Sequence, residues 1–143
     1  MTIETMEVTN CSCASLRRAT RIVTQIYDAA LKPTGLKVTQ FTLLMTIQKS
    51  GELPMKQLAD ALGMERTTLT RNIKPLVKRG FVEIENEDDR RVRRVRLTAA
   101  GAEVLIAAHP SWEKAQAKIV QGLGIKRWGA LNETLRALIN AVQ

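Results

Sequence analysis

The chain has 143 residues, a length typical of one domain that is large enough to bury a hydrophobic core. Apolar residues make up 45% and charged residues 25%, but aromatic residues are only 3%, which argues against a large aromatic-lined catalytic pocket. The 22 basic residues exceed the 14 acidic ones by a net charge of +8, which suits an anionic partner such as nucleic acid or a membrane surface.

The start of the chain, MTIETMEVTN, carries acidic residues where a signal peptide needs basic residues and an apolar run. No apolar stretch approaches the roughly 20 residues of a membrane span, so we expect a cytoplasmic protein with no membrane partner. In a reducing compartment Cys11 and Cys13 are poor candidates for a structural disulfide. The single histidine, His109, cannot supply a usual zinc site, and no catalytic triad or Gly-rich phosphate loop is apparent. The sequence therefore predicts a protein that is not an enzyme and that binds no metal and no cofactor.

The N-terminal part of the chain has the apolar spacing of two helices. Apolar residues at three- and four-residue steps predict an amphipathic helix over 14–31, which Pro33 and Gly35 end. Thr39 is the expected N-cap of the second helix, because its hydroxyl can accept a hydrogen bond from the first turn. Gly51 closes that helix.

Two more helices follow, joined by a tight turn. Pro54 opens the short third helix, and Gly63 supplies the turn before the fourth. The fourth helix covers 65–79, and its interior Pro75 removes one backbone hydrogen bond, so we expect a bend there.

After Gly80 the apolar period changes from helical spacing to strict alternation, which predicts two strands joined by a charged turn. Arg94 and Arg96 share one face of the second strand. Across the hairpin they face Glu83 and Glu85, so these two arginines are expected to form structural ion pairs.

Two helices end the chain. Thr98 is the expected N-cap of a long helix that Pro110 can bend and that Gly122 and Gly124 end. We interpret the apolar stripe of the final helix as a subunit interface, with intrachain core as the alternative. The stripe consists of Trp128, Leu131, Leu135, Leu138, Ile139 and Val142.

Two helices joined by a tight turn and followed by a basic hairpin predict a winged helix-turn-helix within a mainly α fold of the α+β winged-helix type. The fourth helix is then the reader of the major groove, and its polar face carries no acidic residue. A solvated helix face is the alternative, which we favour for Lys78, whereas the guanidinium fork of Arg71 matches guanine. The candidate DNA-binding residues are Arg66, Thr67, Thr68, Thr70, Arg71 and Lys74 on this helix, and Asp89, Arg90, Arg91 and Arg93 near the hairpin tip.

The segment LADALGMERTTLTRNIKPLVKRGFVEIENEDDRRVRRVRLTAAG resembles the core of the MarR family of bacterial transcription regulators. It carries the L-A-x-x-L-G turn, T-L-T-R in the recognition helix, R-G-F-V before the wing, a D-x-R motif and L-T-x-x-G after the wing. Matched by position, the resemblance places Thr67, Thr68 and Arg71 on major-groove contacts. It places Arg91 on a minor-groove contact that Asp89 orients.

The resemblance implies one MarR-type domain over 1–143, with dimerisation helices at about 11–32 and 99–143 and a winged helix-turn-helix at about 37–98. It also implies a homodimer whose terminal helices interlock, whose two winged parts bind a palindromic operator in double-stranded DNA, and whose DNA binding is relieved by a small ligand or an oxidant. The leading hypothesis is therefore a repressor released by a small-molecule effector. Trp112 and His109 either line the effector cavity or only pack.

Two alternatives remain. The first is a thiol-based redox sensor, because Cys11 and Cys13 lie at the start of the first helix, where unpaired N–H groups and the helix dipole favour a reactive thiol. The family's hydroperoxide sensors pair such a cysteine with tyrosines, whereas Tyr27 is the only tyrosine here. Other roles for the two cysteines are simple packing of small side chains and metal sensing. The second alternative is an architectural DNA-binding protein without an effector.

Overall fold

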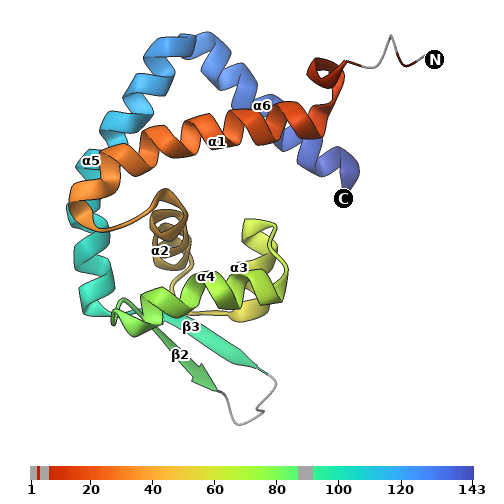
Figure 1. The fold of residues 1–143 in the computed structure, drawn as a ribbon. Coiled ribbons are helices and arrows are strands. Elements are labelled where there is room, and N and C mark those ends of the chain that lie inside the picture. The colour runs from red at the N-terminus through yellow and green to blue at the C-terminus, as the bar shows by residue number, and fades with distance from the viewer. Residues whose placement is uncertain (1–2, 4–6, 87–91) are drawn as a thin grey trace. The chain divides into compact units, whose positions relative to one another are not determined.

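The computed structural model describes residues 3, 7–86 and 92–143 and shows a mainly helical chain with one small antiparallel sheet (Figure 1). Short 3₁₀ turns at Val8–Asn10 and Lys32–Thr34 flank the first helix. The regular elements are α1 (Ser12–Leu31), α2 (Val38–Ser50), β1 (Leu53–Pro54), α3 (Met55–Leu62), α4 (Arg66–Lys78), β2 (Val82–Asn86), β3 (Arg93–Leu97), α5 (Ala99–Leu123) and α6 (Ile125–Val142).

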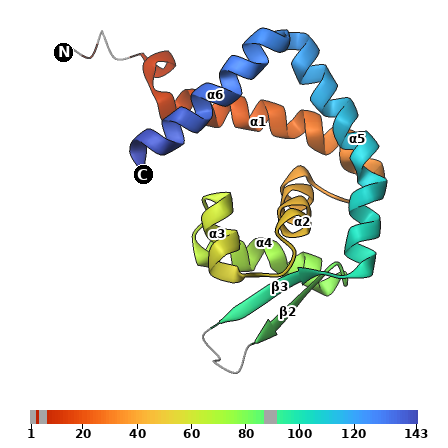
Figure 2. The same ribbon diagram turned by 180° about the vertical axis from the view of Figure 1, so that it is seen from behind.

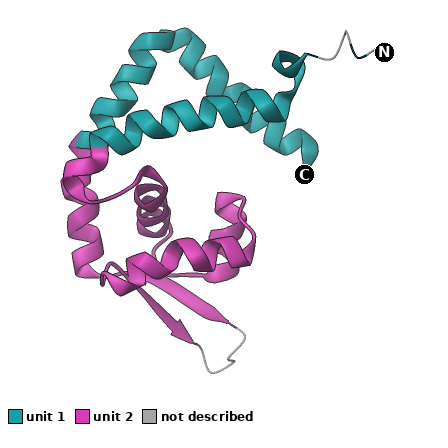
Figure 3. Cartoon of the chain, viewed as in Figure 1, with its two compact units in different colours: residues 1–30, 111–143 teal, residues 31–110 magenta. Residues whose placement is uncertain are grey.

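The chain divides into two compact units, coloured separately in Figure 3. One comprises Met1–Ala30 with Ser111–Gln143, and the other comprises Leu31–Pro110. The second is called the winged unit below, and the first the terminal-helix unit. The first part of α5 thus belongs to the winged unit, whereas the sequence assigns the whole of 99–143 to dimerisation; that division stays a prediction.

The winged unit has a continuous apolar core, because each of its elements turns one apolar face inward. On α4 the buried side chains are those of Leu69, Ile73 and Leu76, the face that helical spacing predicts. The other large side chains that are fully buried are those of Leu31, Phe41, Leu43, Leu44, Ile47, Met55, Leu58, Val82 and Val95.

The start of α2 differs from the prediction. Lys37 is the N-cap residue, and its backbone N–H donates to the Gln40 Oε1 at 3.0 Å. The predicted cap at Thr39 is wrong, since this residue already lies inside the helix. A glutamine three residues after the cap accepts the N–H of the cap residue, which favours a helix start at Lys37. Gly122 also lies inside α5, and Gly124 alone, with φ of 87°, separates α5 from α6.

The sheet contains a strand that the sequence pattern did not predict. Its order is β1-β3-β2, and the two-residue β1 pairs with β3 through Leu53 opposite Val95 and Pro54 opposite Arg94. Two residues are too few to show an alternating pattern, which explains the omission. The pairing holds the start of α3 next to the start of β3.

The junction between β3 and α5 confirms the predicted cap at Thr98. The Gly101 N–H donates to the Thr98 hydroxyl oxygen at 3.0 Å, and that hydroxyl donates to the carbonyl oxygen of Gly80 at 2.6 Å. The first turn of α5 lies so close to Phe81 that a Cβ built on Gly101 would be 2.1 Å from the Phe81 carbonyl oxygen. Only glycine fits there without displacement of the backbone.

A second structural anchor is Arg79, which follows the last residue of α4. Its Nη1 donates to the carbonyl oxygen of Gly35 at 2.8 Å, and its guanidinium carbon lies 4.8 Å from the ring centroid of Phe81. The cation–π contact and the hydrogen bond link the end of α4 to the turn before α2. The R-G-F sequence before the wing therefore has a structural role.

The terminal-helix unit contains α1, the second part of α5, and α6 (Figure 2). The Tyr27 hydroxyl donates to the Gln116 side-chain oxygen, and burial raises the pKa of Tyr27. The ring centroid of Trp112 lies 6.4 Å from that of Tyr27, so both aromatic side chains link α1 to α5. In contrast, α6 has no buried residue in the single chain.

Candidate nucleic-acid interface

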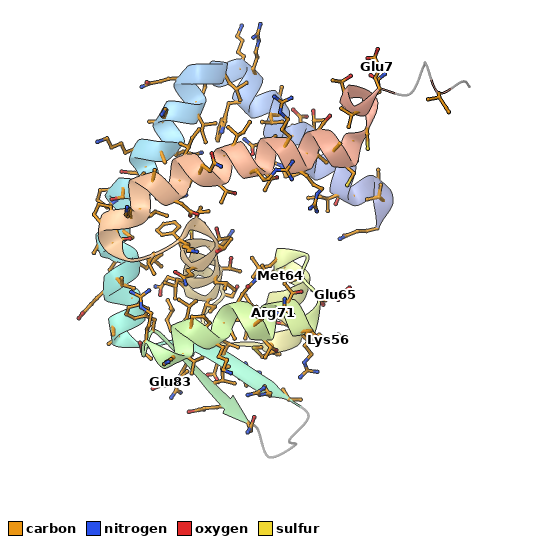
Figure 4. The ribbon with its side chains drawn as sticks, viewed as in Figure 1. Glu7, Lys56, Met64, Glu65, Arg71 and Glu83 are labelled. Atoms are coloured by element: carbon orange, nitrogen blue, oxygen red, sulfur yellow. The ribbon has the colours of Figure 1, made fainter. Side chains whose placement is uncertain are left out.

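The exposed face of α4 carries the residues that the sequence predicts for the major groove. Leu69, Ile73 and Leu76 are buried, so the opposite side of the helix faces outward. Figure 4 shows the Arg71 side chain on this helix. The exposed candidates are Arg66, Thr67, Thr70, Arg71 and Lys74, and Thr68 is half-buried.

The hydroxyls on α4 are not equally available. The Thr70 hydroxyl donates to the carbonyl oxygen of Arg66 at 2.9 Å, so its proton is used within the helix. The Asn72 amide contacts the Met64 sulfur at 3.7 Å, at the turn before α4. Thr67 is exposed and has no such bond among the described residues. We therefore consider Thr67 a better candidate for a donor to DNA than Thr70.

The wing is described only in part. Asp89, Arg90 and Arg91, which the sequence predicts at the tip, lie outside the described residues. Arg93 is the first residue of β3, opposite Asn86, and is exposed. The structure therefore leaves the predicted tip contacts as predictions.

The two arginines further along β3 have structural partners, as predicted in part. Arg96 lies 2.8 Å from both the Glu83 and the Glu85 carboxylates, and the hydrogen bond to Glu83, followed by the charge of Glu85, raises its pKa. Arg94 contacts Glu52, with its Nε 3.3 Å from Oε1. The Glu52 contact was not predicted because it depends on β1, which places this residue beside β3.

A hollow of about 290 Å³ lies where α3, α4 and β3 begin. It brings together two predicted site residues, Arg66 and Arg93, with a lysine that the sequence reasoning missed, Lys56. Lys56 lies in the first turn of the first helix of the helix-turn-helix. A basic residue at the start of this helix is a sequence signal for a DNA contact, since the first helix of such motifs crosses the DNA backbone.

A second hollow, of about 440 Å³, has an apolar lining and lies between α2 and the first part of α5. His109 lines it, and a role of this residue in an effector cavity stays a prediction. Trp112 belongs to the other unit, where it contacts Tyr27. The remaining lining residues are Phe41, Met45, Leu105, Ile106 and Pro110.

The cysteines lie where the sequence predicts, at the start of α1. Cys11 immediately precedes the helix and Cys13 lies in its first turn, and both are free and exposed. Within the described part of the chain, no group of three or more histidine, cysteine or acidic residues is arranged to hold a metal ion. No described helix is long and apolar enough to cross a membrane.

Comparison with known proteins gives one consistent result. The model of the MarR family matches residues 34–92. The solved structure of the transcriptional regulator MosR of M. tuberculosis in complex with DNA has a TM-score of 0.84 and 38% identity, and the match covers 92% of this chain and 96% of that one. This chain belongs to the MarR family. The fold and the family are those of DNA-binding transcription regulators and not of enzymes.

Two further comparisons agree. The HTH-type transcriptional regulator YhbI of Bacillus subtilis (strain 168) is 31% identical over 100 residues, which cover 69% of this chain. The matched region spans 65% of the length of YhbI. A mutant MarR from E. coli, complexed with operator DNA, has a TM-score of 0.77 at 22% identity, covering 86% of this chain and 89% of that one. At that identity the likeness supports the winged-helix fold alone.

Proposed function

We propose that this MarR-family protein is a homodimeric repressor that binds a palindromic operator and leaves it when an effector binds. The observation that carries the DNA-binding part is the exposed face of α4, which presents Thr67, Arg71 and Lys74 opposite a fully apolar buried face. That face has no acidic residue, and the chain has a net charge of +8. The DNA complex of MosR, a protein 38% identical to this chain, supports the same conclusion.

The dimer is supported by apolar surface on the terminal helices. On α6 Ile139 is 52% exposed and Val142 is 74% exposed, and Leu131 and Leu138 are also exposed. On α1 Ile22 is 51% exposed. A monomer rarely leaves this much apolar side-chain surface on one pair of helices in water, so a second subunit is the expected cover.

The effector site is proposed at the apolar hollow between α2 and α5. Phe41 is buried, whereas Met45 and Ile106 are exposed at 40% and 73%. His109 adds a polar group on a lining that is otherwise apolar. A small aromatic acid fits this chemistry, with its ring on the apolar side chains and its carboxylate near the imidazole.

Two experiments test the proposed function. Selection of bound duplexes from a random pool should return a short palindrome, whereas an architectural protein would return no common sequence. A thermal-shift screen of phenolic acids, other small aromatic acids and acyl thioesters should then raise the unfolding temperature for the effector, because a ligand of the native state stabilises it. That compound should also release the selected duplex in a mobility-shift assay.

Two residues of α4, Arg71 and Lys74, are expected to contact different parts of the DNA, a base and the backbone. Arg71→Ala should lose about 1 to 3 kcal/mol of discrimination at one base pair in each half-site. Lys74→Ala should weaken binding to operator and unrelated duplex alike and reduce the salt slope by about one. Salt titrations of both variants on both duplexes measure this. If each variant loses the same factor of affinity on the operator as on the unrelated duplex, Arg71 does not read a base.

A redox switch is the second candidate function, because both thiols are free and exposed at the start of α1. A thiolate attacks the terminal oxygen of an organic hydroperoxide and breaks the O–O bond. The cysteine becomes a sulfenic acid, and the leaving alkoxide takes a proton from water to form the alcohol. We expect a stoichiometric hydroperoxide to release the wild-type protein from its operator. Cys11→Ser or Cys13→Ser should abolish release and leave the affinity in reductant unchanged. Unaltered mobility shifts, with mass spectrometry showing an oxidised cysteine, would exclude the switch.

A further inference from the structure

The hollow where α3, α4 and β3 begin is lined by basic side chains from all three elements, and not from the recognition helix alone. Its floor is apolar, and Met55 there is only 2% exposed. Its volume is about 290 Å³. The rim consists of exposed polar side chains from α3, α4 and β3, which are Lys56, Gln57, Arg66 and Arg93.

The described residues that line this hollow carry an unbalanced charge. Three rim side chains are cationic, and no acidic residue is among the described residues that line the hollow. Elsewhere on β3 the arginines have carboxylate partners, since Arg94 contacts Glu52 and Arg96 contacts two glutamates. Cations that converge without a carboxylate repel one another, so an anion bound between them stabilises the arrangement.

The position of the hollow follows from the short strand β1. Pro54 pairs with Arg94 and is also the N-cap of α3, so the first turn of α3 begins beside β3. The first N–H groups of that turn have no side-chain cap. Figure 4 shows Lys56 in the region of α3 and the start of α4, away from Glu83 on β2. One bound group there would contact both the helix-turn-helix and the wing.

We propose that this hollow binds a phosphate of the DNA backbone, with Lys56 as its principal cation. The proposal rests on the DNA-binding function proposed above and assigns a contact outside the recognition helix. A phosphodiester is a compact anion with acceptor oxygens, which lysine, arginine and amide donors bind. A contact to a phosphate does not distinguish one DNA sequence from another. It fixes the distance from the DNA backbone to the start of α4 and so the register in which α4 enters the groove.

The test uses the full-length protein and a duplex of mixed sequence, measured by fluorescence anisotropy over a range of salt concentrations. Lys56→Gln should weaken binding by roughly fivefold to tenfold at about 0.1 M salt, and the plot of log affinity against log salt should become shallower by about 0.9 for each subunit bound. Lys56→Arg should bind like the wild type, because a guanidinium also pairs with phosphate. Lys56 is exposed, so both variants should keep the wild-type unfolding temperature.

Lys32→Gln is the matched control, since it removes the same charge within the winged unit. Lys32 begins the turn that ends at Gly35, whose carbonyl accepts from Arg79 at the far end of α4. Arg66 and the end of α4 are about 18 Å apart along the helix. Equal losses for Lys56→Gln and Lys32→Gln, or a weak Lys56→Arg variant, would overturn the phosphate site. Absence of binding by the wild type would instead overturn the proposed function itself.

Discussion

Replacing Gly101 with alanine is expected to lower the free energy of unfolding by about 3 kcal/mol, as overpacking against a fixed backbone does. The added Cβ would lie 2.1 Å from the carbonyl oxygen of Phe81 and 2.9 Å from Cδ2 of Leu97. The Phe81 carbonyl also accepts the Thr98 N–H at 3.1 Å, so displacing it disturbs the start of α5 as well. The higher helix propensity of alanine, about 1 kcal/mol, offsets only part of this cost.

Gly122→Ala is the matched control, because Gly122 also lies within α5 and nothing lies within 4 Å of a Cβ built there. This variant should be as stable as the wild type or more stable by up to about 1 kcal/mol. Urea unfolding of the three proteins at one fixed protein concentration measures the difference, since the stability of the proposed dimer depends on concentration. Equal stability of both alanine variants would mean that the first turn of α5 can move away from Phe81.

The double substitution of Leu131 and Leu138 by glutamate is expected to convert the proposed dimer into monomers. Both side chains lie on one stripe of α6 and are 44% and 39% exposed in the single chain. Each carboxylate would be tolerated in water but would have to be buried without a partner in a subunit interface. Loss of the dimer should also weaken operator binding strongly, because a monomer contacts one half-site.

Ala137→Glu with Asn140→Glu is the control for this experiment. It adds the same two charges to exposed positions on the opposite side of α6, so it should leave the dimer intact. Light scattering gives the mass of each variant, and far-UV circular dichroism checks that its helices remain. A clean dimer of native operator affinity from the Leu131 and Leu138 variant would show that this stripe is not the interface.

Local sequence was sufficient to predict the helices and the wing strands. The helical spacing on α4 places Leu69, Ile73 and Leu76 on one face, and these residues are the buried ones. The predicted range of 65–79 differs from the observed Arg66–Lys78 by one residue at each end. Such features depend on neighbouring residues in the chain, because the backbone period determines which side chains share a face.

The candidate site was predicted on α4 by the same reasoning. An exposed polar face is the complement of a buried apolar one, so Thr67, Arg71 and Lys74 could be placed without tertiary information. The ion pairs of Arg96 followed from strand alternation, since the hairpin register puts Glu83 directly opposite. What the sequence determined by itself is therefore the order of the elements and the face on which each side chain lies.

Contacts between residues distant in the chain were decided only by the tertiary structure. β1 is a strand solely because β3 is available to pair with it, and two residues carry no pattern of their own. The same pairing brings Arg94 to Glu52, and it brings Lys56 into one hollow with Arg93. The need for glycine at 101 likewise arises from the Phe81 carbonyl, which lies close in space but 20 residues away in sequence. Such contacts depend on how elements pack in three dimensions, which the period of a single segment does not encode.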